Sequence, residues 1–179
     1  MLIGAREIGE FTPLQRESYD LIASGPRKDV PYPFLAMLDA PGLANAIQAV
    51  GAEIRFSGTL SDEMREVAIL ATAGAFGSGY EWDYHARISR ELGMTEAILD
   101  ATRTGDTTAV ADDHHACTII ELCRSAVLER IVPKSVLAEA VDAFGRTGAS
   151  ELVAIAGYYP LLALFLSAGE LDHPLNQER

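Results

Sequence analysis

Apolar residues recur at intervals of three and four positions along most of this 179-residue chain. That spacing places side chains on one face of an α-helix, whereas a half-buried strand needs alternation at every second position. Nowhere do two strand-like runs flank a turn. The pattern therefore predicts an all-α fold, a single bundle of about eight helices. Capping and helix-breaking residues mark the predicted helices, which span residues 13–23, 42–56, 79–92, 95–104, 113–130 and 136–144. Two further helices are expected to begin at Ser61 and at Ser150.

The length is that of one domain, and a chain of this size can bury a sizeable core. Three stretches differ in composition within it. Residues 1–33 are expected to form an N-terminal helix and a proline-rich arm, residues 34–169 the core, and residues 170–179 a polar tail. The whole chain is therefore predicted to fold as a single domain.

The charge balance limits the partners of the protein. Fourteen Lys and Arg residues stand against 26 Asp and Glu residues, and the basic residues are scattered. Without a basic run, a phosphate backbone has no surface to bind, so no nucleic-acid partner is expected. The first residues also lack the basic segment and apolar stretch of a secretion signal.

The two cysteines point to a reducing compartment. Cys117 and Cys123 lie six residues apart. On a helix they point about 120° away from each other, because each residue turns the helix by about 100°. They cannot bridge without distorting it. Two free thiols are typical of a reducing cytoplasm, and a cytoplasmic location is expected.

One uncharged stretch, residues 152–169, is long enough to be considered as a membrane span. It contains Pro160 and two tyrosines, and acidic residues rather than basic ones flank it. One uncharged helix at the end of an acidic chain is more often buried in a core or a subunit interface. We therefore expect no membrane association.

The stretch from Arg65 to Gly93 contains the side chains best suited to chemistry. Positions 78, 81, 82 and 85 share one face of a helix, so Glu81 and His85 are neighbours. A carboxylate four residues from an imidazole orients its ring. If the preceding helix packs antiparallel about the break at Gly77, Glu66 can face the same patch, and two acids with one imidazole form a proton-transfer site. The candidate catalytic residues are His85, Glu66 and Glu81, and the candidate substrate-binding residues are Tyr80, Trp82, Tyr84 and Ser78.

Each of these residues also has a purely structural interpretation. Ser78 and Glu81 have the spacing of a capping box, a serine at the N-cap with a glutamate three residues on. Trp82 is more often a core residue than a substrate platform. Glu66 could lie on a helix surface, and a lone His85 would usually be structural.

A metal site is a further alternative. It would combine Glu66, Glu81 and His85 with the run Asp112–His115. The adjacent His114 and His115 point about 100° apart on a helix, so both cannot bind one ion without irregular backbone. Helix capping by the aspartates is the more ordinary interpretation, and neither a metal nor another cofactor is expected.

At these residues the chain resembles the carboxymuconolactone decarboxylase family, which includes the AhpD-like alkylhydroperoxidases. The resemblance rests on the combination of REVAIL at 65–70, SGYEWDYH at 78–85 and GMTEAIL at 93–99. The later segments 151–153 and 157–159 are similar to a C-terminal helix of the family. The resemblance covers roughly residues 34–169. It implies an AhpD-like helical bundle and a homo-oligomer, commonly a trimer or a dimer of trimers.

The chain departs from the peroxidase branch of this family at its redox centre. The first position of the Cys-x-x-Cys pair falls on Ser78 and the second on Glu81. A serine cannot form a sulfenic acid or exchange disulfides, and the cysteines elsewhere in the chain do not replace the pair. The resemblance implies a proton relay at Glu66 and His85, and both are retained. Peroxidase activity of the alkylhydroperoxidase or peroxiredoxin type is therefore not expected.

Two classes of function remain open. The first is a cofactor-independent enzyme that acts on a small organic acid, lactone or ketone by decarboxylation, isomerisation or lactone hydrolysis. His85 would be the general acid or base, with Glu66 orienting it and Glu81 as a second acid or base. The second class is a non-catalytic protein of the same fold that binds a small molecule or serves in an assembly.

Overall fold

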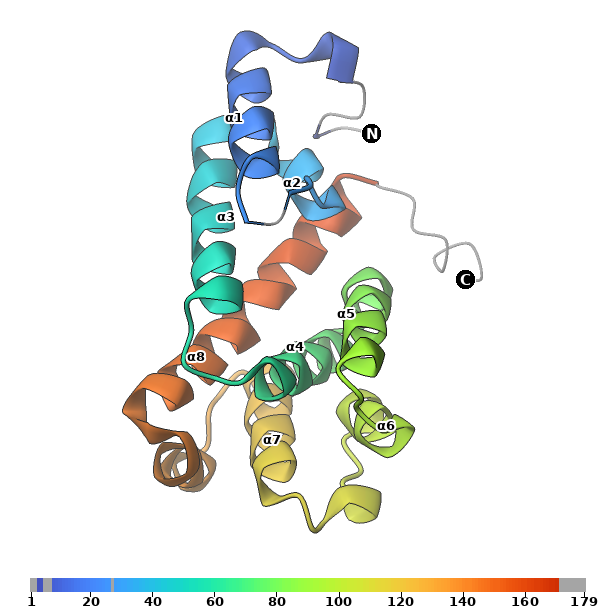
Figure 1. The fold of residues 1–179 in the computed structure, drawn as a ribbon, viewed down its shortest axis with the longest axis vertical. Helices are drawn as coiled ribbons and strands as arrows, with labels where there is room; N and C mark the ends of the chain where they lie inside the picture. The colour runs from blue at the N-terminus through green and yellow to red at the C-terminus, as the bar shows by residue number, and fades with distance from the viewer. Residues whose placement is uncertain (1–2, 5–7, 27, 171–179) are drawn as a thin grey trace. The chain divides into compact units, whose positions relative to one another are not determined.

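The computed structural model describes residues 3–4, 8–26 and 28–170, and this part of the chain is helical with no strand (Figure 1). The all-α prediction with about eight helices is confirmed. Residues 171–179 of the predicted polar tail lie outside the described residues. The α-helices are α1 (Pro13–Ala23), α2 (Tyr32–Met37), α3 (Pro41–Phe56), α4 (Asp62–Phe76), α5 (Gly79–Glu91), α6 (Glu96–Thr104), α7 (His114–Leu128) and α8 (Lys134–Ala168), with 3-10 turns η1 (Ile8–Glu10) and η2 (Thr108–Val110).

The helices form two compact units. One unit contains the chain up to Ser57 together with the end of α8 from Leu161, and in it α1 and α2 pack on α3. The other runs from Gly58 to Pro160, and in it α4 packs against α5, α6 and α7. The division into an arm, a core and a tail, drawn from composition, stays a prediction. All the candidate site residues belong to the second unit.

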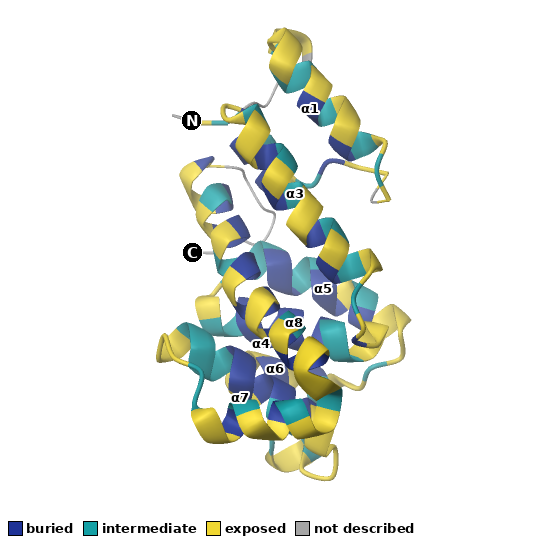
Figure 2. Ribbon diagram, turned by 90° about the vertical axis from the view of Figure 1, so that its left-hand side faces the viewer, coloured by how far each residue is buried: buried dark blue, intermediate teal, exposed yellow. Residues whose placement is uncertain are grey.

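Helix α4 is the centre of the second unit. Every residue from Glu66 to Ala73 is buried, and the burial extends to the adjoining helices (Figure 2). Small side chains let these helices approach closely. A Cβ placed on Gly74 would lie 3.0 Å from the carbonyl oxygen of Thr102 on α6. The lone acid on this stretch, Glu66, is therefore carried into the interior.

The ends of α4 set the direction of the next helix. At its start, the Ser61 hydroxyl accepts a hydrogen bond from the backbone N–H of Met64 at 3.3 Å. At its end, Gly77 adopts φ +81°, a left-handed conformation that costs glycine little. The N–H groups of Gly77 and Ser78 both bond to the carbonyl of Ala73. The helix is thus closed and the chain turns directly into α5.

The prediction for the last helices is confirmed at Gly145 and wrong at Ser150. A helix was expected to end near Gly145–Gly148 and another to be capped by Ser150. Gly145 does leave the helical conformation, at φ 68° and ψ 172°, and a second helical segment follows it directly across a kink. The Ser150 hydroxyl bonds to the Arg146 carbonyl inside that second segment rather than capping it. Because glycine tolerates this backbone conformation, a single residue separates the two segments and the second begins before Ser150.

Helix α8 also has the length and apolar character of a membrane span, with a mean hydropathy of 1.6 over its most apolar window. Half of that window is buried within the protein, as the helix also supplies core residues such as Leu152 and Ile155. A core helix of a folded domain has the same two properties.

Candidate functional site

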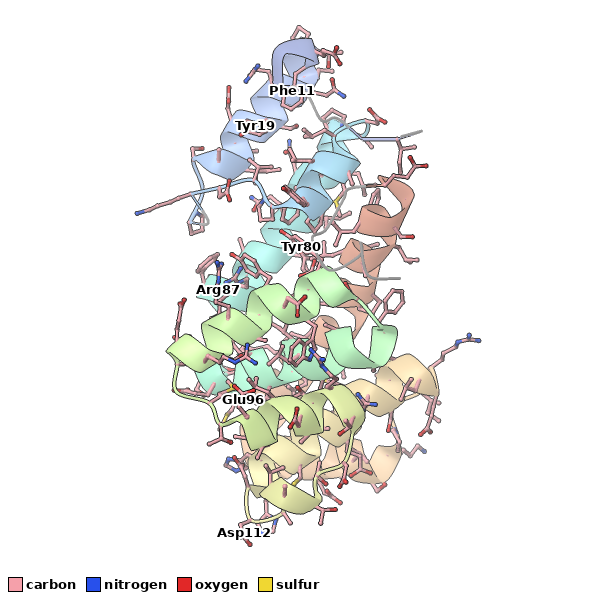
Figure 3. The ribbon with its side chains drawn as sticks, turned by 90° about the vertical axis from the view of Figure 1, so that its right-hand side faces the viewer. Phe11, Tyr19, Tyr80, Arg87, Glu96 and Asp112 are labelled. Carbon is pink, nitrogen blue, oxygen red and sulfur yellow. The ribbon has the colours of Figure 1, made fainter. Side chains whose placement is uncertain are left out.

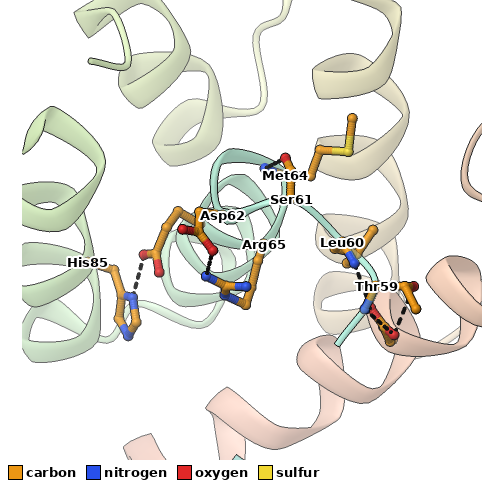
Figure 4. Close-up of polar contacts among 9 residues, drawn as sticks. Thr59, Leu60, Ser61, Asp62, Met64, Arg65 and His85 are labelled. Atoms are coloured by element: carbon orange, nitrogen blue, oxygen red, sulfur yellow. Dashed lines mark hydrogen bonds and ion pairs between the residues drawn. The ribbon is translucent and has the colours of Figure 1, made fainter. Parts of the chain in front are cut away.

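A buried hydrogen bond between side chains of α4 and α5 forms the centre of the candidate site. The Nδ1 atom of His85 lies 2.6 Å from Oε2 of Glu66, and the side chains are only 3% and 2% exposed (Figure 4). A contact this short between a ring nitrogen and a carboxylate requires a shared proton. The carboxylate therefore fixes both the ring orientation and the position of its Nδ1 proton. The surface interpretation of Glu66 is wrong.

The second acid lies on the other side of the imidazole. Glu81 is one helical turn before His85 on α5, and its Oε2 is 3.9 Å from the Nε2 atom of the ring. The Glu81 side chain is 4% exposed, so this acid is also buried. The distance exceeds that of a hydrogen bond. The structure thus brings together the three predicted catalytic side chains, with one carboxylate facing each nitrogen of the imidazole.

Tyrosines surround this imidazole. The ring of Tyr84 meets it edge-on with centroids 5.2 Å apart, and the ring of Tyr159 on α8 does the same at 5.2 Å. Tyr158 in turn packs edge-on against Tyr159. Tyr159 is not among the residues that were predicted for the site from the sequence. The signal that could have found it was the Gly-Tyr-Tyr segment at 157–159, which was used only for the family resemblance.

Tyr80 and Ser78 lie at the start of α5. The rings of Tyr80 and Tyr84 are stacked with centroids 6.3 Å apart, and the Arg87 guanidinium lies 5.5 Å from the Tyr84 ring centroid (Figure 3). Both tyrosines are half-buried, so this aromatic layer reaches from solvent to His85. Ser78 is the N-cap residue of α5 but its side chain makes no capping bond. The capping-box alternative is therefore wrong.

Trp82 belongs to the hydrophobic core. Its indole packs in a buried cluster with Leu70, Ala86 and Leu99, and the Arg103 guanidinium lies 3.5 Å from the ring centroid. The indole Nε1 has no hydrogen-bond partner among the described residues. This is the structural interpretation considered for Trp82. Its predicted role in substrate binding has no support from these contacts.

A glutamate that the sequence analysis left without a role anchors α4. Glu151 on α8 accepts hydrogen bonds from the backbone N–H of Thr59 at 2.8 Å, from the Thr59 hydroxyl at 3.0 Å and from the N–H of Leu60 at 3.1 Å (Figure 4). These residues immediately precede the N-cap of α4. Glu151 therefore positions the helix that carries Glu66, and its place in the family-like segment 151–153 was the available signal.

Both thiols lie on α7, and neither replaces the missing redox pair. Cys117 is half-buried and Cys123 fully buried, and both are free. Burial raises the pKa of the Cys123 thiol to about 12, although a hydrogen bond with Thr72 opposes the shift. A neutral buried thiol is a poor nucleophile.

The Asp112–His115 run begins α7. The Asp113 carboxylate caps the helix by accepting a hydrogen bond from Ala116 N–H at 3.0 Å. The other three side chains are exposed. Within the residues that the structure describes, no group of three or more His, Cys, Asp or Glu side chains is arranged to hold a metal ion. The capping interpretation of this run is confirmed for Asp113.

Two cavities of this unit lie away from these three side chains. A cavity of about 400 Å³ is lined by residues of α4, α6 and α7 and of the turn between α5 and α6, and none of Glu66, Glu81 and His85 is among them. A smaller one of about 270 Å³ lies beside α7. The geometry at His85 is that of a closed cluster of acids, imidazole and tyrosine rings. It can store and relay a proton in surroundings from which water is largely excluded.

Comparison with known proteins supports the resemblance. The model of the carboxymuconolactone decarboxylase family matches residues 41–114, a range that contains Glu66, Glu81 and His85 but neither Glu151 nor Tyr159. No curated protein matches the chain.

Proposed function

Because residues 41–114 of this chain belong to the carboxymuconolactone decarboxylase family, we propose that the protein is a cofactor-independent acid/base enzyme. Its substrate is a small organic acid, lactone or ketone. The observation that carries the proposal is the buried 2.6 Å contact between His85 Nδ1 and Glu66, with Glu81 on the opposite side of the ring.

The proposal gives each side chain a role. Glu66 holds the proton on Nδ1, which leaves Nε2 as the nitrogen that exchanges protons with substrate. In an isomerisation, Nε2 takes a proton from the carbon next to a carbonyl and returns it to another carbon of the resulting enolate. In a decarboxylation, the electrons of the breaking carbon–carbon bond form the enolate, CO₂ leaves, and the imidazolium protonates carbon. Glu81 serves as the second acid or base in either case.

The proposed route to this nitrogen runs along the half-buried tyrosines. Tyr80 stacks on Tyr84, and Tyr84 meets the imidazole edge-on. A substrate would have to displace these rings to reach His85. Tyr159 borders the ring from α8. Aromatic walls strengthen the electrostatic interactions of an enclosed site because they exclude water.

Thiol peroxidase chemistry is disfavoured by the residues present. Ser78 and Glu81 stand at the positions where the peroxidase branch has its cysteines, and the pKa of the buried Cys123 thiol is raised to about 12. Hydroperoxide reduction needs a thiolate that can form a sulfenic acid. This chain therefore retains a proton relay in a scaffold from which the redox centre is absent.

A second candidate is a non-catalytic protein that binds a small molecule or serves in an assembly. The observation in its favour is the closure of the site: the His85 side chain is 3% exposed. A structural hydrogen bond between Glu66 and His85, covered by a layer of tyrosines, gives the same geometry without turnover.

Proton exchange with solvent separates the two candidates without knowledge of the substrate. A panel of small keto acids, lactones and ketones is incubated with the protein in D₂O, and loss of the proton signals next to the carbonyl is followed by NMR. We expect at least one compound to exchange or react in the presence of the protein, and His85→Ala to abolish this. His114→Ala, at an exposed histidine on α7, serves as the control. Exchange that survives His85→Ala would contradict the enzyme proposal, as would a panel in which nothing exchanges.

We also propose that the protein is a homo-oligomer located in the cytoplasm. Support for assembly comes from apolar side chains exposed along α8, including Val153 and Leu164, which are 41% and 58% exposed. Free thiols and an acidic surface support the location.

A further inference from the structure

The cavity of about 400 Å³ is a concave site that the proposed chemistry does not use. Its floor consists of the buried side chains of Val67, Ala116 and Ile119. Two half-buried methionines, Met64 and Met94, form part of the wall. A volume of this size with an apolar floor is within the range that holds small ligands. Flexible, polarisable methionine side chains adapt to ligands of different shape.

This cavity is separate from the acid/base cluster. Val67 lies beside Glu66 in the sequence, but consecutive helical residues point about 100° apart. Glu66 therefore faces His85 while Val67 lines the cavity. A ligand in the cavity would touch none of the three proposed catalytic side chains. Binding there is therefore independent of the proposed acid/base function.

Three helices begin at the rim of the cavity. Ser61, Thr95 and Asp113 are the N-cap residues of α4, α6 and α7, and all three line it. Each of their side-chain oxygens accepts a hydrogen bond from a backbone N–H of its own helix, at 3.3, 3.4 and 3.0 Å respectively. Three helix N-termini contribute a partial positive charge of about 0.5 each, about 1.5 in total. Taken alone, they would favour an anion.

The acidic side chains at the rim reverse that preference. Two acids of these first turns are held by arginines, Asp62 by Arg65 and Glu96 by Arg90. The carboxylates of Glu63 and Asp113 line the cavity and form no ion pair among the described residues. Two full negative charges outweigh about 1.5 positive charges from the helix ends, and the His115 imidazole is the other titratable group of the lining. The rim therefore offers acceptor oxygens and repels an anion weakly.

We infer that this cavity binds a small, mainly apolar molecule whose polar group donates hydrogen bonds, a hydroxyl or an ammonium, and discriminates against the corresponding carboxylate. The apolar body lies on the floor formed by Val67, Ala116 and Ile119. The donor group lies at the rim, where Glu63 and Asp113 accept from it. A carboxylate in the same place has no hydrogen to donate to these acceptor oxygens. Its negative charge would also be repelled by Glu63 and Asp113.

Three probes of nearly the same shape test this inference: benzyl alcohol, benzylamine and benzoate. The full-length chain is labelled with ¹³C at the methionine methyl groups, and each probe is titrated by NMR. Met64 and Met94 line the cavity, whereas Met37 is buried in the other unit and serves as an internal reference. We expect saturable shifts of the Met64 and Met94 signals with the alcohol and the amine, and apparent binding of benzoate at least tenfold weaker. The relative affinities of benzyl alcohol and benzylamine show whether the site prefers a hydroxyl or an ammonium group.

Variants locate the site and its preference. Ala116→Leu fills the floor, and Leu92→Trp, at a lining residue that is 37% exposed, blocks the cavity without altering the core. Both should weaken binding of benzyl alcohol at least fivefold, and Leu21→Trp, at an exposed leucine of α1, should not. If Ala116→Leu does not fold, Leu92→Trp alone tests whether benzyl alcohol binds in this cavity. Glu63→Gln should narrow the preference for benzylamine over benzoate. The inference is overturned if no probe shifts the two methionines, if benzoate binds as tightly as benzyl alcohol, or if the blocking variants bind as the control does.

Discussion

His85 owes its geometry to residues from three helices. Glu66 from α4 fixes one ring nitrogen, Glu81 from its own helix faces the other, and Tyr159 from α8 packs against the ring. The Ser89 hydroxyl, one turn later, donates to the His85 carbonyl at 2.9 Å and is itself buried. An imidazole held in this way has little freedom to rotate, which is the condition for efficient proton transfer.

Replacing Glu66 by Gln tests whether the negative charge matters to chemistry. The amide oxygen still accepts from Nδ1, but the charge that stabilises an imidazolium is gone. We expect kcat/KM on a substrate found by proton exchange to fall about 10²–10⁴-fold, the usual range for loss of an acid/base partner. Glu139→Gln, at an exposed acid of α8, is the matched control.

The same variant should lose about 1–1.5 kcal/mol of unfolding free energy in urea, because a charge-assisted hydrogen bond becomes a neutral one. A loss of stability with turnover unchanged would show that Glu66 is structural only.

The Cys123 thiol predicts a loss of stability at alkaline pH. Its pKa in the folded protein is raised to about 12 from the ordinary value of 9.0, because the buried thiolate is not solvated. The stabilisation from this neutral thiol is complete below pH 9 and is lost as the pH rises from 9 to 12. The slope is about 1.4 kcal/mol per pH unit.

Urea unfolding of wild type and Cys123→Ala between pH 7 and 11 checks this prediction. Other groups titrate in this range, so the difference between the two proteins is the quantity to follow, and it should shrink above pH 9. A difference that is independent of pH would contradict the burial assigned to Cys123. Iodoacetamide on the native protein should modify the half-buried Cys117 first.

At the scale of elements, one arginine ties α6 to α7. The Arg124 guanidinium donates to the carbonyls of Thr102 and Arg103, both at 2.9 Å, and of Thr104 at 3.0 Å. These are the last carbonyls of α6, which have no partner within the helix. Gly105, at φ +85°, ends the helix directly against this side chain.

Arg124→Met keeps the length of the side chain and removes the three donors. We expect a loss of about 1–2 kcal/mol in unfolding free energy, because the part-buried carbonyl of Thr102 is left unsatisfied, whereas the exposed carbonyls of Arg103 and Thr104 can bond to water. Arg146→Met, on the exposed face of α8, should change stability by less than about 0.5 kcal/mol. Equal effects of the two substitutions would show that the cap contributes nothing.

The hydrogen bonds of Glu151 predict that this side chain stabilises the start of α4, the helix that carries Glu66. Glu151→Gln replaces a carboxylate that accepts from Thr59 and Leu60 with a neutral amide. We expect faster amide hydrogen exchange over residues 59–66 and a loss of about 1–2 kcal/mol in stability. The Glu139→Gln control should leave both unchanged. If exchange rises uniformly over all helices instead, Glu151 stabilises the unit as a whole and does not specifically anchor α4.

At the scale of the whole molecule, the exposed side of α8 predicts self-association. Val153, Leu161 and Leu164 are 41%, 36% and 58% exposed on this one helix. Sedimentation velocity should give the mass of an oligomer, a trimer or a multiple of it. Val153→Lys and Leu164→Lys should lower that mass, because a buried lysine in an apolar interface is costly. Leu14→Lys, on exposed α1, is the control. A wild-type monomer at micromolar concentration would refute the assembly.

Local physics determined much of this protein directly from its sequence. Apolar spacing determined the all-α class, and cap residues such as Ser61, Gly77, Thr95 and Gly105 determined where α4 and α6 begin and end. The spacing of Glu81 and His85 placed them on one turn without any knowledge of the fold. Local signals found the break at Gly145 but misplaced the next helix start, because Ser150 lies inside a helical segment that begins before it.

Contacts between distant segments were decided by the tertiary structure alone. Glu66 and His85 are 19 residues apart, and only the packing of α4 on α5 turns a surface-compatible glutamate into a buried partner at 2.6 Å. Likewise, Glu151 reaches Thr59 across 92 residues, and Tyr159 reaches His85 from α8. Sequence spacing specifies the face of a helix on which a side chain lies. Which helix covers that face is set by the burial of apolar surface over the whole domain, a property that no short segment contains.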